Sequence, residues 1–184
     1  PGIACGRCHG EGEAHAWEPR RGNIVNPARL AARARDSVCE QCHLAGTARI
    51  LLPGKRWGDF RAGMELEEVF SVYVPAGRQA FKVVSHAEQL ALSRCAQASG
   101  GKLWCASCHE VPKPKAERAA ASASCAGCHA GTRKHGEACA ECHMPRTKAA
   151  DGGHTAFTDH RIQVPGKAPA VSESADVLRA WREP

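Results

Sequence analysis

Apolar and polar positions alternate over only short stretches of this chain, so the sequence predicts short elements. β-Branched, aromatic and other apolar residues gather at 49–52, 68–74 and 80–84, and Pro-Gly or Pro-Ala-Gly turns bound these stretches. Runs of this kind are typical of short strands joined by tight turns. We expect at most a small β-hairpin in this region.

Two helices are predicted from their start signals. Asn26 followed by Pro27 combines an N-cap with a favoured first helical residue, which predicts a helix over 28–38. Ser85 and Glu88 have the spacing of a capping box, and the helix that they open is expected to end at a Gly-Gly pair. The predicted fold class is therefore mostly coil with short α-helices.

The end of the chain has a different composition. Residues 164–173 contain two prolines and a glycine, which is typical of a linker. Ser174 is placed to cap a last short helix that runs through Trp181.

The pattern Cys-x-x-Cys-His occurs five times. We number these motifs 1 to 5, and they begin at Cys5, Cys39, Cys105, Cys125 and Cys139. Their second cysteines are Cys8, Cys42, Cys108, Cys128 and Cys142, and their histidines are His9, His43, His109, His129 and His143. The composition of the chain predicts roughly 0.03 such motifs by chance. The repeat therefore indicates one specific chemistry.

Covalent haem explains this spacing. Two residues between the cysteines let both thiols reach the two vinyl groups on one porphyrin edge, and the adjacent histidine then binds the iron. Zinc is the alternative, because paired Cys-x-x-Cys units also form zinc sites, but zinc does not require a histidine directly after the second cysteine. A disulfide scaffold fits less well, because neighbouring Cys-x-x-Cys thiols form strained bridges. The sequence predicts five covalently attached haems c, with the motif histidines as proximal ligands.

Five histidines lie outside the motifs and match the number of haems. They are His15, His86, His135, His154 and His160, and we expect them to be distal ligands that make the irons bis-histidine. Met64 is the alternative sixth ligand, because Met144 directly follows a proximal histidine. Cys95 is the cysteine that no motif uses, and we expect it to be a small buried apolar residue.

The reach of the chain predicts how the haems are packed. His15 lies six positions after His9, and His135 six positions after His129, a span of at most about 20 Å when fully extended. Such a span is awkward for wrapping around the edge of one porphyrin. We therefore expect His15 and His135 to serve neighbouring haems, which would pack the haems closely.

Composition and charge agree with a cofactor-rich interior. Aromatic residues make up 5% of the chain, so its own apolar core is expected to be thin and the haems to form the real core. The net charge of +6 would suggest nucleic acid, but about ten haem propionates would turn it to roughly −4. We expect no nucleic-acid partner. Basic residues available to the propionates, or simply solvated, are Arg20, Arg21, Arg33, Arg35, Lys113, Lys115, Arg133 and Lys134.

The predicted domain organisation follows from the motif positions. Residues 1–163 are expected to form the pentahaem domain, with a haem-free β-rich insertion at about 44–84, and 164–184 to lead out of it. No apolar run approaches the roughly 20 residues of a membrane span. The chain starts without an initiator methionine or a signal sequence, which suggests a piece of a longer precursor. Because haem c is attached after export, we expect a periplasmic or extracellular location.

Several segments together resemble a known family. They are residues 5–15, 39–44, 85–90 with 93–95, and 139–145 followed by His154 and 158–162. They resemble the multihaem cytochromes related to the tetrahaem cytochrome c of nitrifiers, and especially those that continue into tetratricopeptide repeats. The resemblance implies that the five histidines outside the motifs occupy distal or haem-contacting positions. Family members often carry a further haem motif upstream and helical repeats downstream, and this sequence contains neither.

The sequence therefore predicts electron transfer without a catalytic residue. Its partners are expected to be redox proteins or other cytochrome modules, with self-association or a larger respiratory complex left open. The alternative is a multihaem oxidoreductase that acts on a small nitrogen or sulfur compound at one five-coordinate haem. Related pentahaem nitrite reductases use a lysine in place of the motif histidine at the catalytic haem. All five motifs here end in histidine, which favours electron transfer.

Overall fold

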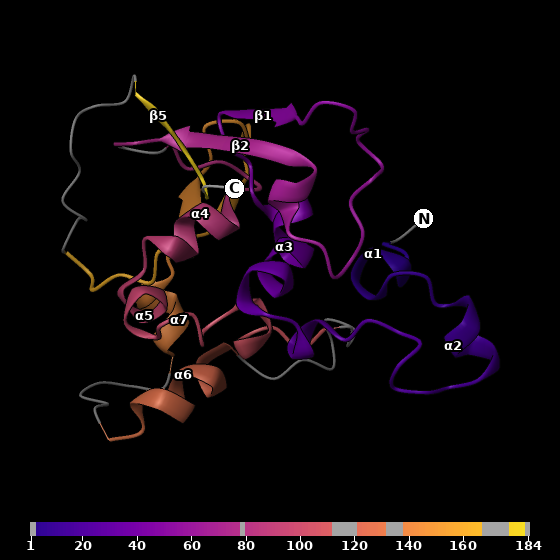
Figure 1. Ribbon diagram of the computed structural model, residues 1–184. Helices are drawn as coiled ribbons and strands as arrows, with labels where there is room; N and C mark the ends of the chain where they lie inside the picture. The colour runs from indigo at the N-terminus through magenta and orange to yellow at the C-terminus, as the bar shows by residue number, and fades with distance from the viewer. Residues whose placement is uncertain (1–2, 78–79, 112–120, 132–137, 167–176, 183–184) are drawn as a thin grey trace. The chain divides into compact units, whose positions relative to one another are not determined.

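The chain divides into two compact units. A computed structural model describes residues 3–77, 80–111, 121–131, 138–166 and 177–182. Unit 1 consists of residues 1–79 and 171–184, and unit 2 of residues 80–170 (Figure 1). No helix in the described ranges is long and apolar enough to cross a membrane.

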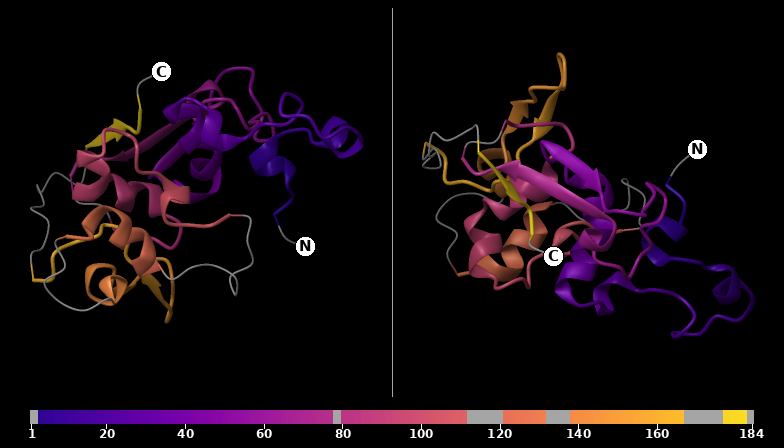
Figure 2. Two further views of the ribbon diagram at one scale, coloured as in Figure 1. Left: turned by 90° about the horizontal axis from the view of Figure 1, so that it is seen from below. Right: turned by 45° about the horizontal axis from the view of Figure 1, so that its top comes forward.

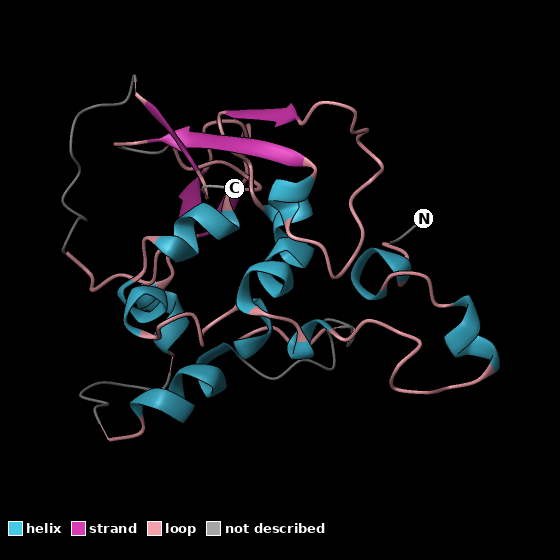
Figure 3. Ribbon diagram, viewed as in Figure 1, coloured by secondary structure: helices cyan, strands magenta, loops and turns pink. Residues whose placement is uncertain are grey.

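Unit 1 combines helices with a three-stranded antiparallel sheet. Its elements are α1 (Gly6–His9), α2 (Glu13–Trp17), the 3₁₀ turn η1 (Pro27–Arg29), α3 (Ala32–His43), β1 (Ala48–Leu51), the 3₁₀ turn η2 (Leu66–Glu68), β2 (Phe70–Pro75) and β5 (Leu178–Ala180). The central strand is β2, which pairs with β1 on one edge and with β5 on the other. Figure 3 shows these short elements separated by loops.

Unit 2 consists of short helical turns and one two-stranded sheet. Its elements are α4 (His86–Ala91), α5 (Arg94–Ala98), the 3₁₀ turn η3 (Cys105–Ser107), α6 (Ala121–His129), α7 (Cys139–His143), β3 (Arg146–Lys148) and β4 (Ala156–Thr158). β3 and β4 form an antiparallel hairpin directly after α7, drawn in orange in Figure 2.

The apolar core of unit 1 lies between α3 and β2. Burial alternates along β2, where Phe70, Val72 and Val74 are buried, as expected for a strand with one face against a core. Ala34 and Val38 lie four residues apart and bury one face of α3. The described residues of unit 2 differ, since most of their buried side chains are polar: Ser85, Glu88, Gln89, Ser93 and Asp159, with Ala149.

A tight turn joins α3 to β1. Gly46 has φ +65°, and a Cβ at this position would lie 2.7 Å from Cγ1 of Val72 and 3.2 Å from the Tyr73 carbonyl oxygen. Both the backbone conformation and the available space therefore require glycine. This turn places the end of α3 against the edge of the sheet.

The structure contains more sheet than the small hairpin that we expected, because it has one three-stranded and one two-stranded sheet in the described ranges. β1 and β2 confirm the strands expected at 49–52 and 68–74. The strand expected at 80–84 does not form, and β5 supplies the third strand of the sheet instead. The helix expected through Trp181 is therefore wrong for the described residues at this end. Pairing of β5 with β2 joins segments about a hundred positions apart, which no local pattern encodes.

The helices follow their predicted start signals only in part. The Asn26 side chain accepts a hydrogen bond from the Ala28 N–H at 3.1 Å, but it opens η1, and α3 starts later and extends through motif 2. Ser85 precedes α4 without capping it, because its hydroxyl is bonded to the backbone of Lys82. The expected single helix is divided into α4 and α5, and Ser93 caps the second of them.

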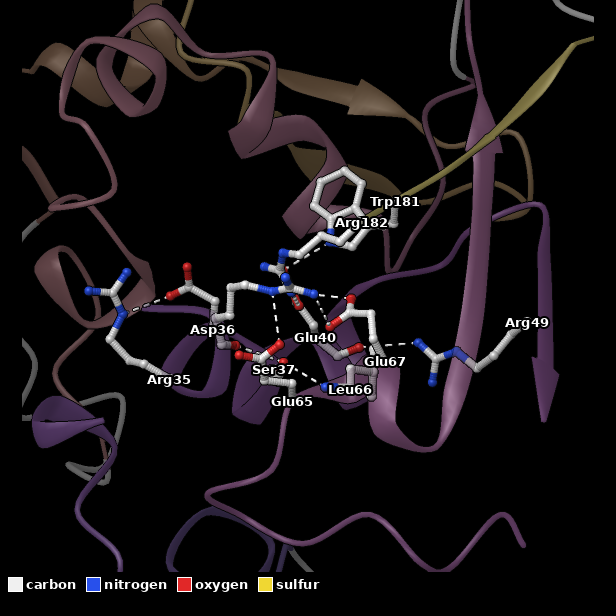
Figure 4. Close-up of polar contacts among 11 residues, drawn as sticks. Arg35, Asp36, Ser37, Glu40, Arg49, Glu65, Leu66, Glu67, Trp181 and Arg182 are labelled. Atoms are coloured by element: carbon white, nitrogen blue, oxygen red, sulfur yellow. Dashed lines mark hydrogen bonds and ion pairs between the residues drawn. The ribbon is translucent and has the colours of Figure 1, made fainter. Parts of the chain in front are cut away.

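A buried ion pair fixes the C-terminal segment to α3. Both oxygens of Glu40 accept hydrogen bonds from the Arg182 guanidinium, at 2.6 and 2.7 Å, and Trp181 Nε1 donates to the same carboxylate at 3.1 Å (Figure 4). Burial raises the pKa of the Glu40 carboxyl, whereas Arg182 acts in the opposite direction. The pair therefore stabilises unit 1 only while both partners are present.

Arg49 of β1 also bonds to the C-terminal turn of α3, which contains Glu40. Its guanidinium donates to the carbonyl oxygens of Gln41 at 2.9 Å, Glu40 at 3.2 Å and Leu44 at 2.7 Å. The Glu40 carbonyl also accepts from the Leu44 N–H at 3.2 Å. Carbonyls of the last helical turn need partners from outside the helix, and a cation there also interacts favourably with the helix dipole. Since motif 2 forms this last turn, Arg49 helps to set its position.

The Glu40 pair gives a stability prediction for the full chain. Glu40→Ala should lower the free energy of unfolding by about 3 kcal/mol, the lower end of the range for breaking a buried pair, because the largely buried Arg182 guanidinium keeps the more distant Glu67 carboxylate at 3.5 Å. Guanidinium chloride titration followed by circular dichroism measures this change. Arg56→Ala is the matched control: it removes a guanidinium that is 88% exposed beside Asp59 and should cost less than about 0.5 kcal/mol. Equal effects of the two variants would contradict the role assigned to Glu40.

Candidate functional site

Each Cys-x-x-Cys-His motif lies on a helical turn. Motif 1 forms α1, motif 2 ends α3, motif 3 includes η3, motif 4 ends α6 and motif 5 forms α7. In a helical turn, residues three and four positions apart lie on the same face. The two thiols and the imidazole of one motif are therefore presented on one side of the chain. None of the eleven cysteines, all of which lie in the described ranges, is part of a disulfide.

Motifs 1 and 2 are bonded to each other within unit 1. The Gln41 side chain, between the two cysteines of motif 2, donates to the carbonyl oxygen of Arg7, between the two cysteines of motif 1, at 2.9 Å. Burial raises the pKa of the Cys8 thiol, and the nearby thiols of Cys42 and Cys5 add to this effect. The cysteines of these two motifs thus lie close together.

The histidine of motif 1 is held by a loop that lies later in the chain. Its Nδ1 lies 2.8 Å from the carbonyl oxygen of Val25, and the Val25 N–H donates to the His9 carbonyl at 3.1 Å. A carbonyl oxygen only accepts, so the hydrogen of the neutral ring lies on Nδ1. The lone pair of His9 is therefore on Nε2, the nitrogen left to bind a metal ion.

The histidine of motif 5 has the same arrangement in unit 2. Its Nδ1 lies 2.7 Å from the carbonyl oxygen of Gln163, and the Gln163 N–H donates to the His143 carbonyl at 3.0 Å. Val25 and Gln163 belong to unrelated loops, yet each makes the same pair of bonds. Two predicted proximal histidines therefore present Nε2 in the same way.

His15, a predicted distal ligand, is oriented by one asparagine. The ring Nδ1 lies 3.0 Å from Asn23 Oδ1 and 3.1 Å from the Arg20 carbonyl oxygen. The amide nitrogen of Asn23 donates to the carbonyls of Ala14 and Glu18 at 3.2 and 2.7 Å, which fixes the amide orientation. Sequence reasoning missed Asn23, because its bonds depend on how the loop after α2 is folded.

Three predicted iron ligands gather in unit 2. The ring of His160 lies 4.6 Å from that of His86 and 6.0 Å from that of His109, measured between ring centroids. His160 Nδ1 also lies 3.0 Å from the Thr158 carbonyl oxygen. His86 is the first residue of α4, as predicted, and His109 is the histidine of motif 3. The fold thus brings two predicted distal histidines to one predicted proximal histidine.

The remaining predicted ligands are placed differently. His154 is exposed in the turn between β3 and β4, and His43 and His129 are exposed at the ends of α3 and α6. His135 lies outside the described residues. Met64, the alternative sixth ligand, is half-buried in the loop before η2.

The thiols of motifs 3, 4 and 5 also lie near one another. Burial raises the pKa of Cys108, and Cys125 is the first of the thiols that raise it further. Burial likewise raises the pKa of Cys125, with Cys139 and Cys95 acting in the same direction. The half-buried Cys95 therefore lies among the motif cysteines of unit 2.

A buried carboxylate between motif 5 and His160 was missed by sequence reasoning. Asp159 is fully buried and accepts hydrogen bonds from Arg161 and Gln163. Burial would raise the pKa of this carboxyl, but the Arg161 guanidinium and N–H lower it below its ordinary value. Its i,i+2 spacing from Arg161 gave no recognisable signal.

Several predicted propionate partners form ion pairs with carboxylates of the chain. Arg20 pairs with Glu18, Arg33 with Glu65 at 2.9 Å, and Arg35 with Asp36 at 2.8 Å. Arg21 is exposed. The other four predicted partners, Lys113, Lys115, Arg133 and Lys134, lie outside the described residues.

Neither a search for metal-binding groups nor comparison with known proteins identifies this site. Within the described ranges, no group of three or more histidine, cysteine, aspartate or glutamate side chains is arranged to hold a metal ion. No protein-family model, curated protein or solved structure matches the chain significantly.

Proposed function

We propose that this chain is a c-type cytochrome with five covalently attached haems that transfers electrons through closely packed, mainly bis-histidine irons. The observation that carries the proposal is the shared orientation of His9 and His143. In both, a backbone carbonyl accepts from Nδ1, and an N–H of the same residue returns to the histidine carbonyl. Proteins commonly use an acceptor at one ring nitrogen to direct the other toward a metal ion.

The donor set of each motif fits haem c. Two thiols and one imidazole lie on one helical turn, as attachment and proximal ligation require. Haem c, when bound, supplies an iron that changes between the ferrous and ferric states. The carbonyl at Nδ1 fixes the ring and increases the basicity of Nε2. These residues therefore set both the position and the electronic character of the proximal ligand.

The interior of unit 2 supports a cofactor core. Buried side chains there are mostly polar in the described ranges, and such an interior gains little from the hydrophobic effect. Three motifs converge on the same unit. We propose that porphyrin rings, which are large and apolar, form the centre of unit 2.

Close spacing of the haems is supported within each unit. The Gln41–Arg7 hydrogen bond joins motifs 1 and 2. The porphyrin edges attached to the cysteines of these two motifs would therefore be adjacent. In unit 2, the thiol of Cys125 lies near those of Cys108 and Cys139, which connects three motifs. Adjacent attachment edges favour rapid electron exchange between neighbouring haems.

The cellular setting follows from the attachment chemistry. Thioether formation takes place after export, and free thiols persist poorly in oxidising compartments. We therefore propose a periplasmic or extracellular location, with redox proteins or other cytochrome modules as partners.

Haem counting tests the proposal directly. The purified full chain should carry five haems, measured by haem absorbance against polypeptide and by intact mass. Replacing both cysteines of motif 1 by serine should leave four, because neither thioether can form. Cys95→Ser is the matched control and should retain five. Zinc bound in place of haem would reject the proposal.

Asn23 gives a separate prediction about one sixth ligand. Asn23→Ala removes the side-chain acceptor of His15 and two bonds that hold its loop. We expect five haems, with one low-spin signal partly replaced by a high-spin signal in the paramagnetic resonance spectrum. Asn26→Ala, which removes only the cap of η1, should keep the wild-type spectrum. Identical spectra for the two variants would show that Asn23 does not orient a ligand.

One observation favours the oxidoreductase as a second candidate. Unit 1 contains two motifs but a single further histidine, His15, so one of its irons lacks a histidine sixth ligand from within unit 1. Met64 belongs to the same unit and could complete that iron. An iron left open would instead bind small molecules.

Carbon monoxide binding distinguishes the two candidates. The electron-transfer proposal predicts that the reduced chain binds far less than one carbon monoxide per chain, because all five irons have two protein ligands. Absorbance titration of the reduced protein measures this. Rapid binding of one carbon monoxide per chain would favour the oxidoreductase.

A further inference from the structure

The β3–β4 hairpin returns the chain to motif 5. Its register pairs Arg146 with Thr158, so the residues that follow β4 lie beside those that follow α7. The Asp159 N–H donates to the carbonyl oxygen of Pro145 at 3.0 Å. The segment that begins with Asp159 is thereby fixed two residues from His143.

One carboxylate organises this segment. Oδ1 of Asp159 accepts from the backbone N–H of Arg161 at 2.9 Å, and Nε of the same arginine lies 2.8 Å from Oδ2. The Gln163 side chain donates to Oδ2 at 3.1 Å. Since Asp159 is fully buried, these bonds replace water and define the shape of residues 159–163.

The backbone inside this segment is strained. Ile162 has φ +46°, and among the described residues it is the non-glycine residue with positive φ. A β-branched side chain disfavours this conformation, which persists only where neighbouring bonds enforce it. Bonds to Asp159 from Arg161 and Gln163 flank Ile162 on both sides. The carboxylate is therefore in position to maintain the turn.

The strained turn connects two predicted iron ligands. Beyond Ile162, the Gln163 carbonyl accepts from Nδ1 of His143 at 2.7 Å. Next to Asp159, the backbone N–H of His160 donates to Gln89 Oε1 at 2.9 Å. The proximal ligand of motif 5 and a distal ligand are thus parts of one hydrogen-bonded unit.

A purely stabilising ion pair explains less of this arrangement. Asp159 and Arg161 are two residues apart, so their pairing joins no distant parts of the chain. It fixes local shape instead, and that shape determines where the Gln163 carbonyl and His160 lie.

We propose that Asp159 is a positioning residue. Through the turn formed by residues 159–163, it holds the rings of His143 and His160 in the orientations in which they bind haem iron. The inference rests on the proposed haem function. In this role Asp159 acts through Gln163 and the backbone and does not touch the iron.

The test is Asp159→Asn in the full haem-loaded chain. Asparagine keeps the size of the side chain but loses the charge-assisted bonds to Arg161. We expect five haems and an altered low-spin signal in the paramagnetic resonance spectrum. We also expect about 10- to 100-fold greater carbon monoxide binding at one haem of the reduced protein, the same order as the change in metal affinity or activity when a group that orients a metal ligand is removed. Wild-type spectra and carbon monoxide binding in this variant would overturn the inference.

Two further variants make the test decisive. Asp151→Asn is the matched control: its carboxylate is exposed, accepts from the Val83 N–H at 2.8 Å in the same unit, and should change neither readout. Gln163→Ala removes one bond to Asp159 but keeps the backbone carbonyl at His143, so it should alter the same signal less strongly. If Asp159→Asn does not accumulate, an unchanged signal in Gln163→Ala overturns the inference. A wild-type chain without haem would instead reject the proposed function itself.

Discussion

An imidazole ring has two nitrogens, and a hydrogen bond at Nδ1 determines what Nε2 can do. When a carbonyl oxygen accepts at Nδ1, the neutral ring carries its lone pair on Nε2 and the ring plane is fixed. His9 and His143 are held in this way by backbone, and His15 is held by an asparagine. The loops that supply these acceptors otherwise have little regular structure. For these three histidines, loop residues and not helices or strands supply the acceptor.

The two units are stabilised by different means. Unit 1 has an apolar core between α3 and β2, and Glu40 ties the C-terminal segment to that core through Arg182. In the described part of unit 2, most buried side chains are polar, and its segments are joined by hydrogen bonds to Ser85, Gln89 and Asp159. A proposed cofactor core accounts for this difference, because porphyrins would provide the apolar surface that few buried side chains supply in the described part of unit 2.

Sequence reasoning predicted local elements better than long-range ones. The strands at 49–52 and 68–74 and the start of a helix at His86 follow from patterns within a few residues, and all three are confirmed. The strand expected at 80–84 and the helix expected through Trp181 are wrong. At the C-terminal end, β5 forms in place of the expected helix and fills the second edge of β2. Local propensity contains no information about which distant segment will occupy an edge.

The sequence by itself determined which groups are available: five Cys-x-x-Cys-His motifs, whose spacing within five residues places two thiols and an imidazole on one helical turn. It also determined the set of five further histidines. Only the tertiary structure decided which acceptor holds each ring, because Val25 and Gln163 lie 16 and 20 residues from the histidines that they orient. The role that we propose for Asp159 also depends on tertiary structure, because it requires burial and a hairpin that returns the chain to motif 5. Covalent spacing is a local property, whereas burial and ring orientation arise only when separate segments pack together.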